Sequence, residues 1–229
     1  MITNIFFLIS CTFFIIASTI HLIACAKSNR KLQIITKPML MPLILASSIL
    51  VLTFRWPDSK NLIIFTSFAI TFACMGNIFF IRQERIKMLV FGILFFGLSN
   101  LNWIVILFPS IKLFPLNPFF KIAFILFYTG IIFISIFTGR KLSKAKIALI
   151  TAFALILCAL NYATIATLIG TRTLYSLLQF FGTILLMAAS YLYLMNLCGK
   201  STKNNQFFVM LTYLVAQALI SAGIIMMIY

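Results

Sequence analysis

The sequence predicts an all-α integral membrane protein with eight transmembrane helices, and three observations carry that prediction. The 229-residue chain is 63% hydrophobic, its mean hydropathy is +1.17, and its apolar residues fall in long continuous runs. Soluble globular chains contain far less apolar sequence, and the runs are too long for the strands of a membrane barrel. A helix needs about 20 apolar residues to cross the hydrocarbon core, so each run is long enough to span it.

The expected helices follow one another with short basic or proline-containing breaks between them. They cover residues 3–25, 34–54, 61–81, 87–108, 119–138, 146–169, 174–197 and 206–229. The breaks read AKSNRK, RWPDSK, RQER, FPSIKLFPLNP, GRKLSK, GTRT and GKSTKNN. Because no break exceeds a short loop, we expect residues 1–229 to form one eight-helix membrane domain.

The first run ends in LIAC, residues 22–25, which resembles a lipoprotein cleavage box. A leading apolar run can be a signal peptide, but such a peptide starts with a basic segment. The opening residues MITN carry no basic side chain, and the run is long enough to span a bilayer. We therefore expect the first helix to remain uncleaved.

Basic residues are distributed unevenly between the two ends of the expected bundle. We number the seven connections between expected helices in chain order, so that the odd-numbered ones lie on one side of the membrane and the even-numbered ones on the other. The odd-numbered connections and the adjoining helix ends hold 13 of the 18 Lys and Arg residues. The even-numbered ones hold the other five: Arg55, Lys60, Lys112, Lys121 and Arg172. The side richer in Lys and Arg stays cytoplasmic. This predicts a multi-pass protein of the cell inner membrane with both termini outside. Anionic lipid headgroups account for the net charge of +16, and no nucleic-acid partner is expected.

Acidic residues are nearly absent, which restricts the chemistry available inside the membrane. The only two, Asp58 and Glu84, lie in the polar breaks RWPDSK and RQERIK, so every apolar run lacks a carboxylate. The five cysteines show no CxxC motif and no paired spacing, and a thiol in an apolar run behaves as a small hydrophobe. The sequence therefore predicts no metal site, no disulfide framework and no cofactor.

Several polar side chains nevertheless lie within the expected spans, where they usually face a partner or a cavity. We expect Asn102, Asn161 and Gln179 to tie helices together by hydrogen bonds. The expected topology brings others into one central cavity open toward the cytoplasmic leaflet: Lys37, Asn77, Asn100, Ser190, Asn196, Tyr213 and Gln217. In the third and seventh helices a small residue lies next to a polar one, and each of these two helices is followed by a helix with a buried amide. This similarity suggests a 4+4 parallel repeat, in which the second four helices repeat the first four.

The same residues carry a resemblance to the YhhN family, the bacterial relatives of the animal lysoplasmalogenases, which are eight-helix membrane proteins. TKPMLMPLIL is similar to the family's Lys-Pro segment, CMGNIFFI to its Gly-Asp segment, and FGILFFGLSNLNW to its segment with Ala-His and Tyr. GTILLMAASYLYLMN and LTYLVAQALI resemble its Ser-Asp…Asn and Thr-Tyr-Tyr…Ala-Gln segments. The similarity covers most of the chain in order, including the spacing.

The departures from the family pattern fall on its ionisable residues. By this resemblance the two membrane aspartates of the family fall on Asn77 and Ser190, its histidine falls on Asn100, and its following tyrosine falls on Trp103. The family's acid and base positions are thus neutral here. The resemblance implies that Lys37, Asn196, Tyr213 and Gln217, which match the family, belong with them to the substrate-binding site.

The family reaction is hydrolysis of the vinyl ether of a lysoplasmalogen, which begins with a rate-limiting proton transfer to carbon. An asparagine cannot supply that proton and a serine is too weak an acid, so we expect hydrolysis to be impaired or lost. The first hypothesis is a membrane protein that keeps a pocket for a single-chain lysophospholipid or ether lipid. A second is an active ether-lipid or lysolipid hydrolase that uses His21, a tyrosine or bound water. A third is a small lipid or anion carrier, for which Pro38 and Pro42 are the only hint.

Overall fold

A computed structural model describes residues 2–53, 59–81, 85–113, 117–140, 142–200 and 204–227, with the side chains of 2–5 and 110–113 excluded. Eight α-helices and no strand occur in this part of the chain. They are α1 (Ile2–Ala26), α2 (Arg30–Leu52), α3 (Lys60–Phe80), α4 (Ile86–Leu113), α5 (Pro118–Gly139), α6 (Lys144–Thr171), α7 (Leu174–Leu197) and α8 (Asn205–Met226). Each is long and apolar enough to cross a membrane, as the sequence predicts.

The helix bounds follow the predicted runs closely, with α4 as the main exception. The sequence places its end at residue 108, yet α4 continues through Pro109 to Leu113. A proline removes one helical N–H and leaves one carbonyl without its usual partner. Near the end of a span that carbonyl can be satisfied by water or a neighbour, so a single proline there does not end the helix. Asp58 and Glu84, predicted in loops, lie outside the described residues.

The helix α2 is also continuous through its two prolines, Pro38 and Pro42. Pro42 lacks the N–H that would bond the carbonyl of Pro38, four residues earlier. The Cys74 thiol on α3 donates to that carbonyl instead, at 3.7 Å. The freed backbone group is therefore satisfied by a neighbouring helix, and α2 does not have the break that a carrier would use.

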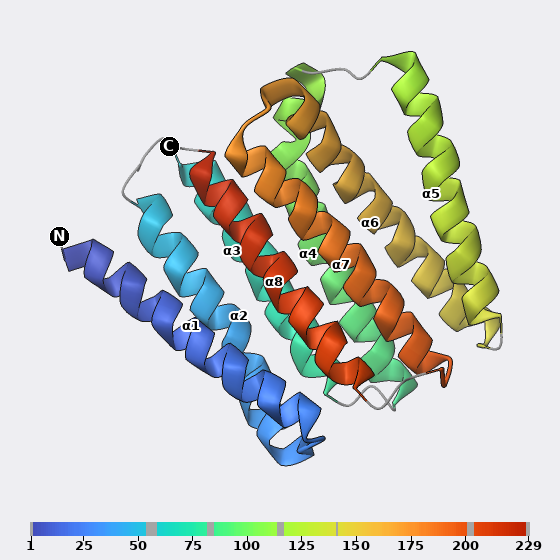
Figure 1. The fold of residues 1–229 in the computed structure, drawn as a ribbon, viewed down its shortest axis with the longest axis horizontal. Helices are drawn as coiled ribbons and strands as arrows, with labels where there is room; N and C mark the ends of the chain where they lie inside the picture. Colours follow the sequence, from blue (N-terminus) through green and yellow to red (C-terminus); the bar gives the residue numbers. More distant parts are fainter. Residues whose placement is uncertain are drawn as a thin grey trace.

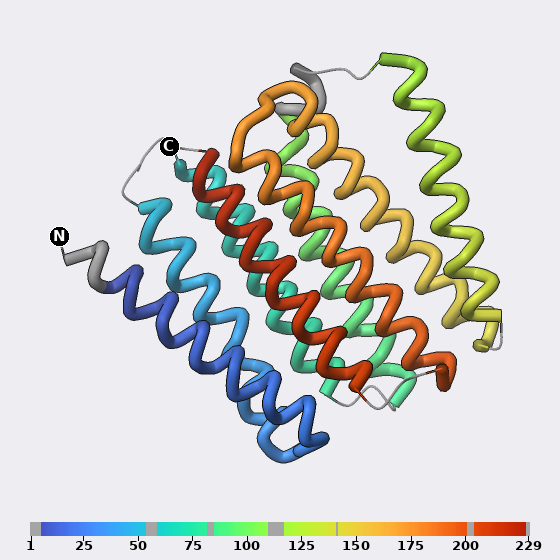
Figure 2. Tube along the Cα trace, in the orientation of Figure 1, coloured from blue at the N-terminus to red at the C-terminus, as the bar shows by residue number. Residues whose placement is uncertain are grey.

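The eight helices run alternately up and down, so both termini lie at the same end of the bundle (Figure 1). Six of them form a closed ring, because α2 packs on α3, α3 on α4, α4 on α6, α6 on α7, α7 on α8 and α8 on α2. The other two lie outside this ring: α1 packs on α2 and α8, and α5 packs on α6 and α7. Figure 2 shows α1 and α5 at opposite sides of the molecule.

Close helix contacts in the ring depend on glycine at the α7–α8 crossing. A Cβ at Gly223 would lie 2.7 Å from the carbonyl oxygen of Tyr175, and one at Gly182 would lie 3.0 Å from that of Ala216. Small residues allow helix backbones to approach this closely. The pairs α7–α8 and α3–α4 are the most extensive in the molecule. In a 4+4 repeat α3–α4 and α7–α8 would be corresponding pairs. The repeat itself stays a prediction.

Candidate functional site

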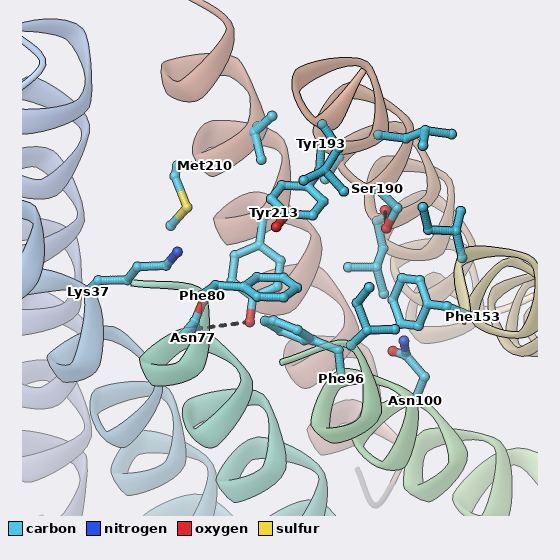
Figure 3. A pocket seen from close by; sticks show the side chains of 17 residues that line it. Lys37, Asn77, Phe80, Phe96, Asn100, Phe153, Ser190, Tyr193, Met210 and Tyr213 are labelled. Atoms are coloured by element: carbon cyan, nitrogen blue, oxygen red, sulfur yellow. Dashed lines mark hydrogen bonds between the residues drawn. The ribbon is translucent and has the colours of Figure 1, made fainter. Parts of the chain in front are cut away.

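A central cavity lies inside the ring, in the half of the bundle near the start of α2 and the end of α7. It is lined by 17 side chains that come from α2, α3, α4, α6, α7 and α8, and by none from α1 or α5 (Figure 3). The cavity has a volume of about 100 Å³. Its walls are mostly aliphatic and aromatic, so the few polar groups that face it are the candidates for specific recognition.

Among the described residues, Tyr193 and five other side chains with polar groups line the central cavity. Each of these five comes from a different helix: Lys37, Asn77, Asn100, Ser190 and Tyr213. All five are among the seven residues that the sequence predicts for the site. They are brought together from positions as much as 176 residues apart in the chain, because Lys37 lies near the start of α2 and Tyr213 in α8. Lys37 and Asn100 lie on opposite sides of the cavity in Figure 3.

Asn77 and Tyr213 form the hydrogen-bonded centre of this group. The Asn77 amide donates to the Tyr213 hydroxyl at 3.2 Å, and that hydroxyl in turn donates to the Met41 sulfur at 3.5 Å. Asn77 is 2% exposed. A carboxylate at position 77, which the resemblance implies for the family, would accept the tyrosine hydrogen that here goes to Met41.

Ser190 and Asn100 are the other two uncharged residues on which, by the resemblance, the family's ionisable positions fall. The Ser190 hydroxyl donates to the carbonyl of Leu186 on its own helix at 2.8 Å, so its proton is already engaged. Asn100 is 2% exposed and contributes an amide to the wall. Neither group is an acid strong enough to protonate carbon.

Lys37 is the one cationic side chain among the described residues that line the central cavity. Its Nζ lies 5.9 Å from the centroid of the Phe80 ring, within the range of a cation–π contact. No aspartate or glutamate occurs among the described residues, since Asp58 and Glu84 fall outside them. Within the described part of the chain, Phe80 is therefore the contact that the structure records for the Lys37 ammonium.

His21, the proton donor of the second sequence hypothesis, is buried between α1 and α2 and does not line the cavity. Its Nδ1 lies 2.7 Å from the Thr36 hydroxyl, which donates its only hydrogen to the Leu32 carbonyl. The imidazole Nδ1 must therefore donate to Thr36, which leaves Nε2 to accept from the Cys25 thiol at 3.6 Å. All of its hydrogen-bonding capacity is used within the helix pair, so His21 is a packing residue.

Of the three polar residues predicted to tie helices, Asn161 does so. Its Oδ1 accepts from the Tyr128 hydroxyl at 2.8 Å and its Nδ2 donates to the Thr183 hydroxyl at 2.9 Å, which joins α5, α6 and α7. The prediction is wrong for Asn102, whose amide bonds the Leu98 carbonyl of its own helix. It is wrong for Gln179 too, because neither polar atom of that buried side chain has a partner among the described residues.

The remaining two predicted site residues, Asn196 and Gln217, are not among the side chains that line the cavity. Asn196 accepts a hydrogen bond from Asn205 at 2.7 Å and so links the end of α7 to the start of α8. Gln217 lies one turn beyond Tyr213, and its Oε1 is buried without a partner in the described part of the chain. Their role in binding stays a prediction.

The aromatic wall of the cavity is the part that sequence reasoning missed, because the 26 phenylalanines are spread through all of the apolar runs and none of them stands out. Phe80 and Tyr193 stack with ring centroids 4.9 Å apart, and Phe96 meets Tyr213 edge to face at 5.5 Å. The spacing of these aromatic residues from the predicted polar residues could have identified the wall. Positions three or four residues apart share a helix face, and these rings lie three or four residues from Asn77, Ser190 or Asn100.

The YhhN family model matches residues 32–224 of the chain. The chain belongs to the YhhN family. Neither a comparison with curated proteins nor one with solved structures gives a match.

The extent of the YhhN match agrees with the architecture. It begins in the first turn of α2 and ends in α8, so it takes in all six ring helices and α5 but none of α1. Family membership and eight apolar helices together support a lysoplasmalogenase-like, multi-pass membrane protein.

Proposed function

We propose that this YhhN protein binds a single-chain phospholipid, a lysophospholipid or an ether lipid, with its polar end in the central cavity. The observation that carries the proposal is the meeting of polar groups from five helices, those of Lys37, Asn77, Asn100, Ser190, Tyr193 and Tyr213, in a cavity whose other lining residues are apolar. Lys37 supplies a positive charge for the phosphate. Asn77, Asn100, Ser190 and Tyr213 supply neutral donors and acceptors for the ester, ether or hydroxyl oxygens.

The proposal also states that the protein does not hydrolyse a vinyl ether at the pace of a lysoplasmalogenase. In that reaction a proton adds to the carbon remote from the ether oxygen, and water attacks the oxocarbenium carbon that results. The hemiacetal then separates into an aldehyde and an alcohol. General acid–base help is worth about 10² to 10⁴ in rate. The groups at the family's acid and base positions, Asn77, Ser190 and Asn100, are all neutral and provide none of it.

An aldehyde-release assay tests the proposal. Purified wild-type protein is given lysoplasmenylethanolamine beside the double variant Asn77→Asp/Ser190→Asp and the two single variants. We expect a silent wild type and release of aldehyde by the double variant, because both carboxylates would then face one cavity. Aldehyde release by the wild type that falls on Asn77→Leu or Ser190→Ala substitution would contradict the proposed loss of hydrolysis.

Retention of the intact lipid is the second readout. The wild type should retain radiolabelled lysophosphatidylethanolamine through gel filtration, while glycerophosphoethanolamine, which has no tail, should be lost. Failure to retain the lysolipid would overturn the binding proposal whatever the hydrolysis assay gives.

We further propose that the protein resides in the cell inner membrane with both termini outside. The support is the excess of Lys and Arg, 13 of 18, at the odd-numbered connections. The central cavity, in the half of the bundle near those connections, would then open toward the cytoplasmic leaflet.

A further inference from the structure

The central cavity is too small for the ligand proposed for it. Its volume is about 100 Å³, whereas pockets that bury a small molecule usually measure roughly 300–1,000 Å³. A lysophospholipid held there must therefore extend into neighbouring space. Two further hollows adjoin the central cavity, one polar and one apolar, and each shares wall residues with it.

The polar recess lies beside the start of α2 and has a volume of about 240 Å³. Lys37 and Phe80 line both the recess and the central cavity, so the two are neighbours through these side chains. Arg30 adds a second cationic residue to the recess wall. Gln206 of α8 donates to Gln33 of α2 at 2.7 Å, which holds the wall together across 173 residues of sequence.

The lateral groove lies on the other side of the central cavity, between α5, α6 and α7, and measures about 430 Å³. Its lining is almost wholly apolar and includes Ile131, Ile134, Ala154 and Met187. Ile150, Phe153, Ser190 and Leu194 line both this groove and the central cavity. The groove exists because α5 lies outside the ring and packs only along part of its length.

Polarity therefore changes in one direction along the three hollows, from two cations through neutral polar groups to aliphatic side chains. An amphiphile with one anionic head and one hydrocarbon tail has the same order. We infer that the lateral groove holds the hydrocarbon tail of the bound single-chain lipid, while the polar recess holds its phosphate; this rests on the proposed function. The lipid passes between α6 and α7 at Ser190, and α5 covers the tail.

A single channel of this kind also predicts a preference for one tail. The groove joins the cavity only at the four shared residues on α6 and α7, so a second chain on the same glycerol would have to remain in the bilayer outside. Diacyl lipids should accordingly bind less well than their single-chain counterparts.

Photolabelling tests the assignment with the full-length protein. The probe is lysophosphatidylethanolamine with a diazirine at the end of its acyl chain, and the adducts are mapped by mass spectrometry. We expect them in residues 131–135 of α5 and 187–191 of α7, and we expect excess unlabelled lysophosphatidylethanolamine to compete. Adducts spread evenly over the lipid-facing helices, or equal labelling by a diazirine-tailed diacyl phosphatidylcholine, would overturn the inference.

Two obstructing variants and one matched control sharpen the test. Ala154→Phe narrows the groove, whereas Ala152→Phe changes an exposed residue of the same helix that does not line it. We expect Ala154→Phe to lower the adduct yield in the groove about tenfold relative to Ala152→Phe, since an added ring overfills the space. Ala188→Phe, on the exposed edge of the groove, should act in the same direction and decides the matter if Ala154→Phe does not fold.

The result also separates this inference from the proposed function. If the wild type fails to retain radiolabelled lysophosphatidylethanolamine, the proposed function falls and the groove assignment falls with it. If the lipid is retained but both obstructing variants label like Ala152→Phe, the binding proposal stands and the groove assignment alone is wrong.

Discussion

At the scale of single residues, the site is defined by one cation among neutral polar groups. Lys37 lies at the junction of the central cavity and the polar recess, beside Phe80. A lysine buries its aliphatic stem and keeps its ammonium near polar partners. Here the ammonium stays inside the ring of helices, where a bound phosphate can reach it. We therefore expect recognition of an anionic ligand to depend on Lys37.

Replacing Lys37 should weaken binding of anionic lipids selectively. We expect Lys37→Gln to lower the affinity for lysophosphatidylethanolamine about tenfold, because a charge-assisted hydrogen bond is worth about 1.5–3 kcal/mol. Binding of an uncharged monoacylglycerol should be unchanged. Lys31→Gln, at an exposed position of the same helix, is the control. Equal losses for both lipids would mean that Lys37 supports the fold and does not read charge.

His21 should matter for stability and not for lipid binding. His21→Ala removes the donor to the Thr36 hydroxyl, which keeps its own bond to the Leu32 carbonyl, and the acceptor of the buried Cys25 thiol; loss of buried hydrogen bonds costs about 1–3 kcal/mol. A thermal melt should show the loss, while retention of lysophosphatidylethanolamine stays at the wild-type level. A melting temperature equal to that of the wild type would show that the buried hydrogen bonds are not formed.

At the scale of the helices, α7 and α8 are held together by close backbone contact at Gly182 and Gly223. These two helices carry Ser190 and Tyr213, so their separation sets the width of the central cavity on that side. In a membrane, association of helices relies on packing of this kind, because lipid tails are as apolar as the helix surfaces.

A methyl group at the crossing should separate these helices. Gly223→Ala places a Cβ 2.7 Å from the Tyr175 carbonyl oxygen, and overpacking of this kind costs about 1–3 kcal/mol. Gly130→Ala on α5 is the matched control, since its Cβ would meet nothing within 4 Å. It should be neutral or stabilising by up to about 1 kcal/mol, because alanine favours a helix. The free energy of unfolding in detergent, measured for both variants, decides the point.

Asn161 connects α5 to the ring, and its loss should loosen the helix that covers the lateral groove. We expect Asn161→Leu to destabilise the protein by about 0.6–2 kcal/mol, the range for hydrogen bonds between membrane helices. Asn102→Leu should have a smaller effect, since Asn102 bonds only the Leu98 carbonyl of its own helix. Hydrogen exchange in α5 should rise in the first variant only; a rise in both would contradict this view of Asn161.

The helices themselves could be predicted from the sequence, because apolar run length and polar breaks fix where a membrane span begins and ends. Five site residues could be predicted from the family resemblance. The order of the ring could not, since these helices are apolar all round and no polar face marks their neighbours. The contrast between Asn161 and Gln179 has the same origin: whether an amide meets a partner depends on helix rotation, which packing sets.

At the scale of the whole molecule, a six-helix ring encloses the site and two helices lie outside it. The cavity lining uses every ring helix, so each contributes to one surface although they are spread over nearly 180 residues of sequence. The two outer helices have different consequences. α5 forms one wall of the lateral groove, whereas α1 lies outside the residues that the family match covers.

The orientation of the protein in the membrane can be tested with reporter fusions. We expect a C-terminal alkaline phosphatase fusion to be active and a C-terminal green fluorescent protein fusion to be dark in bacterial cells, because both termini are predicted outside. A fusion after residue 200, in the basic connection that follows α7, should behave in the opposite way. A fluorescent C-terminal fusion would reverse the assignment and direct the polar recess to the outer leaflet.

If the proposed phospholipid binds at Lys37, it becomes a thermodynamic component of the folded state. No carboxylate lies among the described residues, and the phosphate of the proposed lipid would supply a counter-ion for Lys37. A ligand that binds only the native state adds about 2.7 kcal/mol of stability at a hundred times its dissociation constant. Detergent that strips phospholipid during extraction would then remove the counter-ion of Lys37 as well as the surrounding bilayer. We expect the lifetime of the folded protein in detergent to increase with the phospholipid content of the preparation.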